Sequence, residues 1–308
     1  MMEKIKKVSS LFKYAAIGFG KDNAFKLSAS LSYYTIFAIG PLLIIIISLA
    51  GMVYGKVAVQ GKIYLQLKDL IGSDAAMQIQ NIIQNIQRSE TSTIGTIVGT
   101  VILIIAATGI FTEMQDSINY IWSVKAKPKK GWLKFLSNRL LSFSLVLGLG
   151  FLLLVSLIIS TLFNFLSLQL AEAFPNYDLS FFHSINSLIF FVVLTGLFGV
   201  IFKVLPDAVI TWKDAMIGAS LTAVLFLIGK FVIGYYLGKL NLGITYGTAA
   251  SIIIILSWVY YSALILFFGA EFTKMFALQA GSGIRPKDTA VFIIKSESKE
   301  VPDSYLDT

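Results

Sequence analysis

Long apolar segments almost free of charge are the feature that most constrains this chain. A helix needs about 20 mostly apolar residues to cross the hydrocarbon core of a bilayer, which is about 30 Å thick. The segments that meet this requirement are residues 27–54, 94–111, 140–165, 184–205, 215–237 and 251–276, and the second continues as helix to Trp122. They are continuous rather than alternating, unlike the strands of a membrane barrel. The sequence therefore predicts an all-α, polytopic membrane protein with six transmembrane helices.

The composition supports this prediction and excludes several kinds of function. Of the 308 residues, 56% are hydrophobic and 14% are charged, and the mean hydropathy is +0.79, whereas soluble domains average about 25% charged residues. The chain has no cysteine, which rules out disulfides, thiolate zinc sites, iron–sulfur clusters and a cysteine nucleophile. His183 is the single histidine. We therefore expect no metal, no cofactor and no catalytic residue, and a protein that is not an enzyme.

Basic residues lie mostly on one side of the predicted membrane. The segments before the first span, at 112–139, at 203–214 and after 270 hold 19 of the 25 Lys and Arg. Because basic residues mark the cytoplasmic side, both termini are expected in the cytoplasm. This topology accounts for the net charge of +8 without a basic face for nucleic acid. The first apolar run is longer than the core of a cleavable signal peptide, so we interpret it as a retained span.

The chain divides into three parts by composition. Residues 1–26 form a basic, amphipathic cytoplasmic segment, expected along the inner interface, which Gly18 and Gly20 interrupt and after which Asp22 or Asn23 caps the next helix. Residues 27–276 form the transmembrane domain. Residues 277–308 are a polar cytoplasmic tail, and its mixed charge from about residue 280 predicts flexibility.

Two loops have features of their own. In the first extracytoplasmic loop, at 56–93, apolar residues recur at helical spacing and predict two short amphipathic helices. These helices either cover the bundle or form a gate or partner surface. The polybasic turn at 125–134 is expected to attract anionic lipid head groups.

Ionisable residues inside the predicted spans are candidate functional residues, because burying charge in a bilayer is costly. Lys230 in the fifth span either reaches the outer interface or binds an anionic group. Glu113 and Asp116 are three residues apart, so they share a helical face at the inner end of the second span. Glu271 lies near the inner end of the sixth. These carboxylates form either an ion network that pins helices or a cytoplasm-facing cavity, lined also by Tyr33, with a proton- or cation-linked carboxylate.

Small and kinking residues suggest how the helices pack. Tyr33 and Tyr34 follow a small, hydroxylated face in the first span, and Pro41 can kink that helix. Small residues spaced by four allow close helix contact. The glycine pairs with this spacing are Gly95 with Gly99 and Gly234 with Gly238. They serve packing within the chain or binding of a partner, including a further copy of the chain.

Three stretches of sequence together resemble a known family. They are Ala29–Pro41 in the first span, Leu205-Pro-Asp with Trp212–Ala219 entering the fifth, and Tyr246-Gly-Thr-Ala-Ala-Ser with Trp258–Glu271 through the sixth. Over about residues 10–280 the chain resembles the YihY/virulence factor BrkB family of bacterial inner-membrane proteins. The resemblance implies six helices with cytoplasmic termini. Its recurrent residues are Tyr33, Tyr34, Pro41, Lys230, Tyr246, Gly247, Gly269 and Glu271.

The resemblance implies labels of virulence and transport but no single activity. An old family label, ribonuclease BN, conflicts with the residues, because RNA cleavage needs metal-binding or acid–base groups facing water. We expect a multi-pass protein of the bacterial inner membrane that transports or exports a ligand not identified by the sequence. The alternative is a non-transporting envelope-integrity or scaffold protein, and a lipid-modifying enzyme is a third reading.

Overall fold

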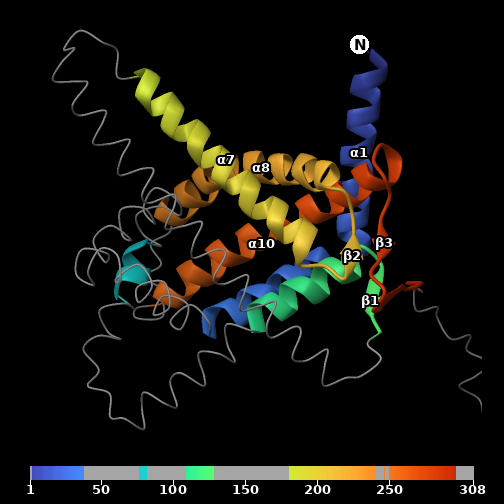
Figure 1. Ribbon diagram of the computed structural model, residues 1–308. Helices are drawn as coiled ribbons and strands as arrows, with labels where there is room; N and C mark the ends of the chain where they lie inside the picture. Colours follow the sequence, from blue (N-terminus) through green and yellow to red (C-terminus); the bar gives the residue numbers. More distant parts are fainter. Residues whose placement is uncertain are drawn as a thin grey trace, which may run out of the picture.

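The computed structural model describes residues 2–37, 76–81, 109–127, 180–239, 246 and 250–295, and these are mostly helical (Figure 1). Three long helices form the centre of this part: α7 (Ser180–Val204), α8 (Trp212–Lys239) and α10 (Ala250–Gln279). Their bounds agree closely with the last three predicted spans. Within α8 and α10, Trp212–Leu237 and Ile252–Gln279 are long and apolar enough to cross a membrane, and Phe190–Val204 of α7 is a shorter apolar helix.

The remaining predicted spans lie largely outside the described residues. Residues 24–37 are helical at the start of the first span, and 109–121 are helical at the end of the second, as its predicted continuation requires. The two helices run side by side beneath α10 in Figure 1. The third span, at 140–165, and almost all of the loop at 56–93 lie outside the described residues, apart from a helical turn at 76–81.

The N-terminal helix α1 (Met2–Lys21) packs on the last part of α10. The ring of Phe12 lies 6.3 Å from that of Phe268 and 5.1 Å from that of Phe272, between ring centroids. Contrary to the sequence prediction, Gly18 and Gly20 lie within the helix, because tertiary packing offsets their low helix propensity. An apolar face at helical spacing thus docks on another helix of the same chain.

A turn of two residues separates α1 from helix 24–37. Asn23 has a left-handed backbone with φ 52°, which asparagine tolerates better than most residues. Its carbonyl accepts hydrogen bonds from the backbone N–H groups of Lys26 at 2.9 Å and Leu27 at 3.1 Å. Asn23 therefore begins the second helix, and the side chain of Asp22 is left for other contacts.

Helices α8 and α10 meet through two copies of one short pattern. Gly218-Ala-Ser-Leu-Thr222 lies in α8 and Gly269-Ala-Glu-Phe-Thr273 in α10. Each threonine packs on the glycine of the other helix, where an added Cβ would overlap the threonine hydroxyl. Each hydroxyl donates a hydrogen bond within its own helix, from Thr222 to the Gly218 carbonyl at 2.8 Å and from Thr273 to the Gly269 carbonyl at 2.7 Å. The reciprocal arrangement lets the two backbones approach closely.

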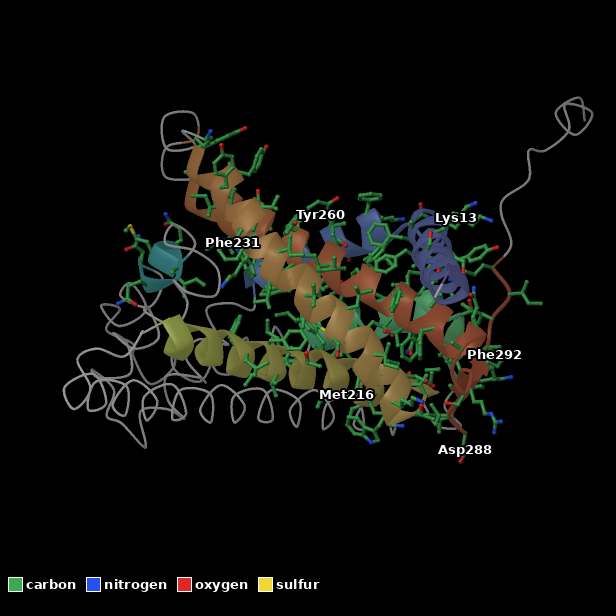
Figure 2. All side chains as sticks on the ribbon, turned by 90° about the horizontal axis from the view of Figure 1, so that it is seen from above. Lys13, Met216, Phe231, Tyr260, Asp288 and Phe292 are labelled. Carbon is green, nitrogen blue, oxygen red and sulfur yellow. The ribbon has the colours of Figure 1, made fainter. Side chains whose placement is uncertain are left out.

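Four short strands lie together at one end of the bundle. Strand β1 (Val124–Ala126) pairs antiparallel with β4 (Ala290–Phe292), and β2 (Ala208–Val209) pairs antiparallel with β3 (Arg285–Pro286). Figure 2 shows Asp288 and Phe292 at this end and Phe231 far from it along α8. The all-α prediction is incomplete here, and the prediction of flexibility from residue 280 is wrong for the strand-forming part. Such pairings join segments far apart in the sequence, so no local sequence pattern predicts them.

Candidate functional site

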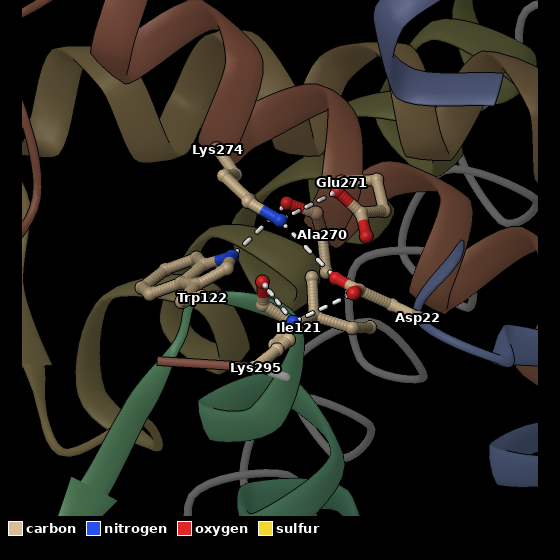
Figure 3. Close-up of polar contacts among 7 residues, drawn as sticks. All are labelled: Asp22, Ile121, Trp122, Ala270, Glu271, Lys274 and Lys295. Atoms are coloured by element: carbon tan, nitrogen blue, oxygen red, sulfur yellow. Dashed lines mark hydrogen bonds and ion pairs between the residues drawn. The ribbon is translucent and has the colours of Figure 1, made fainter. Parts of the chain in front are cut away.

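Four charged side chains gather where α1, α10 and the segment after β4 meet. We call Asp22, Glu271, Lys274 and Lys295 the charge cluster (Figure 3). Lys274 donates to Asp22 Oδ2 at 3.1 Å and to Glu271 Oε2 at 3.2 Å, and Lys295 donates to Asp22 Oδ1 at 2.7 Å. Asp22 thus joins two lysines from different segments, and two carboxyl groups face two ammonium groups.

Asp22 occupies this place because the turn after α1 turns its side chain toward α10. Its side chain is only 7% exposed. Burial raises the pKa of the Asp22 carboxyl. This effect is outweighed by side-chain hydrogen bonds with Glu271 and Lys295 and by the positive charges of Lys274 and Lys295, which lower the pKa. The pKa therefore lies below its ordinary value of 3.8, and Asp22 is ionised at neutral pH.

Glu271 is fully buried, with 0% of the residue exposed. It lies within the apolar stretch Ile252–Gln279 of α10, three residues before Lys274 on the same helical face. Its carboxyl group lies against Gly18 of α1, where an added Cβ would be 2.8 Å from Oε2. Its other oxygen, Oε1, is buried without a hydrogen-bond partner among the described residues. An unsatisfied buried polar atom is costly, so this oxygen marks a place where a proton or a polar ligand would be favourable.

Lys295 brings a distant segment to the cluster. Besides Asp22 it donates to the carbonyl of Ile121 at 3.4 Å, and its ammonium lies 4.3 Å from the centre of the Tyr120 ring. Burial lowers the pKa of Lys295 below its ordinary value of 10.5, and the hydrogen bond and negative charge of Asp22 act in the opposite direction. Beside it, the Trp122 indole donates to the Ala270 carbonyl at 3.0 Å, which ties helix 109–121 to α10.

A second polar group lies nearby and holds the strand-bearing loop between α7 and α8. Asp207 is buried and accepts hydrogen bonds from Asn119 at 2.9 Å and Gln115 at 3.3 Å. The Asp207 N–H donates to Asn119 Oδ1 at 2.7 Å, so the Asn119 amide both donates and accepts. The backbone carbonyl of Asp207 accepts a hydrogen bond from the N–H of Lys287 at 2.9 Å.

A third polar group joins the start of α8 to the end of α10. Thr211 caps α8, since its hydroxyl accepts a hydrogen bond from the Asp214 N–H at 3.3 Å. The Asp214 carboxylate accepts from the Ser282 N–H at 3.1 Å and from the Ser282 hydroxyl at 2.7 Å. This buried carboxylate therefore has an anchoring role.

The predicted site residues are only partly brought together. Glu271 is central, but Tyr33, Tyr34 and Asp116 are exposed and Glu113 is half-buried, so they do not share its buried surroundings. On helix 109–121 the buried polar face carries Gln115 and Asn119, which donate to Asp207, and not the two carboxylates.

Lys230, a candidate for binding an anionic group, and the predicted packing residues have different outcomes. Lys230 is half-buried, with its ammonium 5.3 Å from the centre of the Phe190 ring and 5.1 Å from that of Phe231. Gly234 is predicted at a close helix contact, but an added Cβ there would meet nothing within 4 Å among the described residues. Gly238 lies in α8. The candidates outside the described residues are Pro41, Gly95, Gly99 and Gly247.

The residues that sequence reasoning did not assign to the site are Asp22, Asp207, Lys274 and Lys295. Glu271 and Lys274 have the spacing of a helical ion pair, which was a usable signal. Asp22 was noticed only as a helix cap, and Lys295 carried no signal, because it reaches the cluster through strand pairing. Within the described ranges, no group of three or more Asp, Glu, His or Cys is arranged to hold a metal ion.

Long apolar helices, with charged groups packed where they converge, define a helical membrane protein. A comparison with family models matches residues 15–291 to the family described as virulence factor BrkB. The match spans most of the chain, and the chain belongs to this family, as the sequence motifs indicated.

Curated relatives are membrane proteins as well. A "UPF0761 membrane protein" of Psychromonas ingrahamii is 26% identical over 283 residues, covering 89% of each chain. Proteins of the same name from Delftia acidovorans and Tolumonas auensis are 27% and 28% identical, over 83% and 58% of this chain. The chain spans 59% and 56% of the length of those two relatives. No solved structure gives a significant match.

Proposed function

We propose that the protein crosses the bacterial inner membrane six times with both termini in the cytoplasm. The strand pairings support this topology, because they bring Asp22, β1, β2 and β3 to one end of the bundle. Between successive members of this set the sequence has two predicted spans each, which returns the chain to the same side every time. The lysine-rich segments of the chain belong to this side, and basic segments stay in the cytoplasm.

We propose further that the protein transports a solute across this membrane and that Glu271 couples the movement to protons or cations. The observation that carries the proposal is the full burial of Glu271 in an apolar helix with Oε1 unpartnered among the described residues. Ionisable groups at such positions mark ion and substrate pathways in membrane proteins. A carboxylate kept there at a cost to stability needs a role beyond packing.

The arrangement gives this carboxylate a way to act on the helices. Lys274 of α10 links this helix to Asp22 at the end of α1, and an ionised Glu271 competes with Asp22 for the same ammonium group. A proton on Glu271 removes the repulsion between the two carboxylates and lets Glu271 donate to Asp22 in a charge-assisted hydrogen bond, about twice as strong as a neutral one. Loss of that proton would thereby loosen α10 from α1 at the cytoplasmic end, which is the movement that an opening entrance requires.

A scaffold without transport is the alternative that a specific observation favours. The two Gly–Thr contacts interlock α8 and α10 tightly, and a rigid packed pair suits a protein that supports the envelope. In that case the charge cluster pins helices and moves nothing. In neither function does the chain act as an enzyme, and both have the lipid bilayer, with its anionic head groups, as the constant partner.

The two functions are separated by flux measurements in proteoliposomes. Vesicles with and without the protein are loaded with a cell extract, and solutes that cross are compared by mass spectrometry at several pH values. We expect a pH-dependent solute that E271Q no longer moves, while D116N, a matched change at an exposed carboxylate, moves it normally. A flux equal in E271Q and wild type at every pH contradicts the coupling role, and no flux of any solute favours the scaffold.

A further inference from the structure

The segment after α10 crosses the end of the bundle and touches each element that meets there. It begins beside the start of α8, where Ser282 binds Asp214. It then pairs with β2 through β3 and with β1 through β4. It ends on Asp22 through Lys295. We call residues 280–295 the clip.

The clip pairs with the rest of the bundle through short strands. Its strands have two and three residues, and isolated two-stranded pairings of this size are marginally stable. Ile294 is 97% exposed and Phe292 is largely exposed, so the last part of the clip buries little apolar surface. The ion pair of Lys295 with Asp22 is therefore a large share of what holds this end in place.

The end of the clip binds at two strained turns. Asn23 and Ser123 are the non-glycine residues with positive φ in the described part of the chain, at 52° and 57°. Lys295 binds Asp22 next to the first turn, and the Ile293 N–H donates to the Ser123 carbonyl at 2.8 Å in the second. Left-handed backbone is unfavourable at residues other than glycine and persists only where surrounding contacts hold it.

The two turns are the joints from which helices 24–37 and 109–121 enter the bundle. We propose that the clip is releasable, and that docking of Lys295 on Asp22 holds these two helices against α10 while its release lets their ends separate. This inference rests on the proposed transport function, in which the clip closes the cytoplasmic entrance. The clip itself is a structural property that can be tested without any flux.

The first test measures access to a buried position beside the joint. Ala24 is fully buried at the start of helix 24–37, and the natural chain has no cysteine, so A24C gives a single reactive thiol. Its alkylation by a water-soluble maleimide is timed in detergent-solubilised protein. K295Q is expected to raise the rate about tenfold, as loss of a charge-assisted hydrogen bond would.

The matched control is K287Q, which removes the same charge from the clip but touches the Val204 carbonyl rather than Asp22. It should leave the alkylation rate near that of A24C alone. Equal rates in K295Q and K287Q overturn the proposal.

The second test locks the clip in place, so it does not depend on a destabilised variant. Lys125 and Val291 are opposite each other in the β1–β4 register and both are exposed, and opposite residues in such pairs lie within the range of a disulfide. The doubly substituted protein K125C/V291C is compared oxidised and reduced by hydrogen exchange at the backbone amides of Lys26 and Leu27. Slower exchange in the oxidised form supports release of the clip. Identical exchange in the two forms would show that the clip does not open, and failure of the disulfide to form would show that the clip is not docked. Either result contradicts the proposal.

Discussion

Gly18 of α1 lies directly against the buried carboxyl group of Glu271 in α10, so close that a methyl group at residue 18 would be 2.8 Å from Oε2. A glycine two turns from the apolar contact of Phe12 is therefore what lets α1 approach the charged part of α10. The contact explains why a residue of low helix propensity stands inside this helix.

The substitution G18A is expected to destabilise the protein although alanine favours helix. The methyl group must displace a carboxyl group that Lys274 holds, and overpacking of this kind costs about 1–3 kcal/mol. G20A is the control, because a Cβ there meets nothing within 4 Å in the described part of the chain, and it should be neutral or stabilise by about 0.5–1 kcal/mol. Thermal unfolding in detergent distinguishes them, and equal melting temperatures would contradict the close contact.

The crossing of α8 and α10 predicts a compensating pair of substitutions. G218A places a methyl group on Thr273 and should destabilise by about 1–3 kcal/mol. The double variant G218A/T273G restores the space and should recover part of the loss, reduced by the cost of a new helical glycine. G196A in α7 controls for alanine in a helix, because none of the residues that the structure describes lies within 4 Å of a Cβ there. Additive effects of G218A and T273G would show that the residues do not touch.

The lowered pKa of Asp22 predicts a loss of stability in acid. A carboxyl whose pKa is lower in the folded than in the unfolded protein stabilises the fold above its ordinary pKa of 3.8. This contribution is lost as the pH falls through the lower folded value, and the bonds to Lys274 and Lys295 are lost with it. D22N should be less stable at neutral pH and should show a flatter decline between about pH 5 and pH 3. The free energy of unfolding against pH checks this, and parallel curves for D22N and wild type would contradict it.

The Asn119–Asp207 contact predicts a large effect from a small change. N119A removes a donor and an acceptor from buried Asp207, and loss of hydrogen bonding to a buried charged group costs about 1.5–3 kcal/mol. D116N, on the exposed side of the same helix, should change stability by less than about 0.5 kcal/mol. Unfolding by heat or denaturant measures both. A double-mutant cycle of N119A with D207N should show a coupling free energy between the two side chains. Additive effects of the two substitutions would contradict the contact.

The sequence by itself determined the environment and the long elements. Apolar runs of bilayer length located α7, α8 and α10, because hydrophobic length is a local property that needs no knowledge of neighbours. The same pattern singled out Glu271, since a charge in an apolar run is conspicuous wherever its partner lies. The motifs also placed the chain in its family, which the family model confirms over residues 15–291.

Only the tertiary structure decided which polar groups meet. Asp22 and Lys295 are 273 positions apart in the chain, and the charges between them follow no period, so their 2.7 Å contact depends on how strands and helices pack. Packing likewise buries Gln115 and Asn119 of helix 109–121 rather than its two carboxylates. The close helix contacts fall at Gly18, Gly218 and Gly269, whereas Gly234 has no such contact with any described residue. Pair contacts are set by the assembled backbone, whereas hydrophobicity is carried by each residue alone.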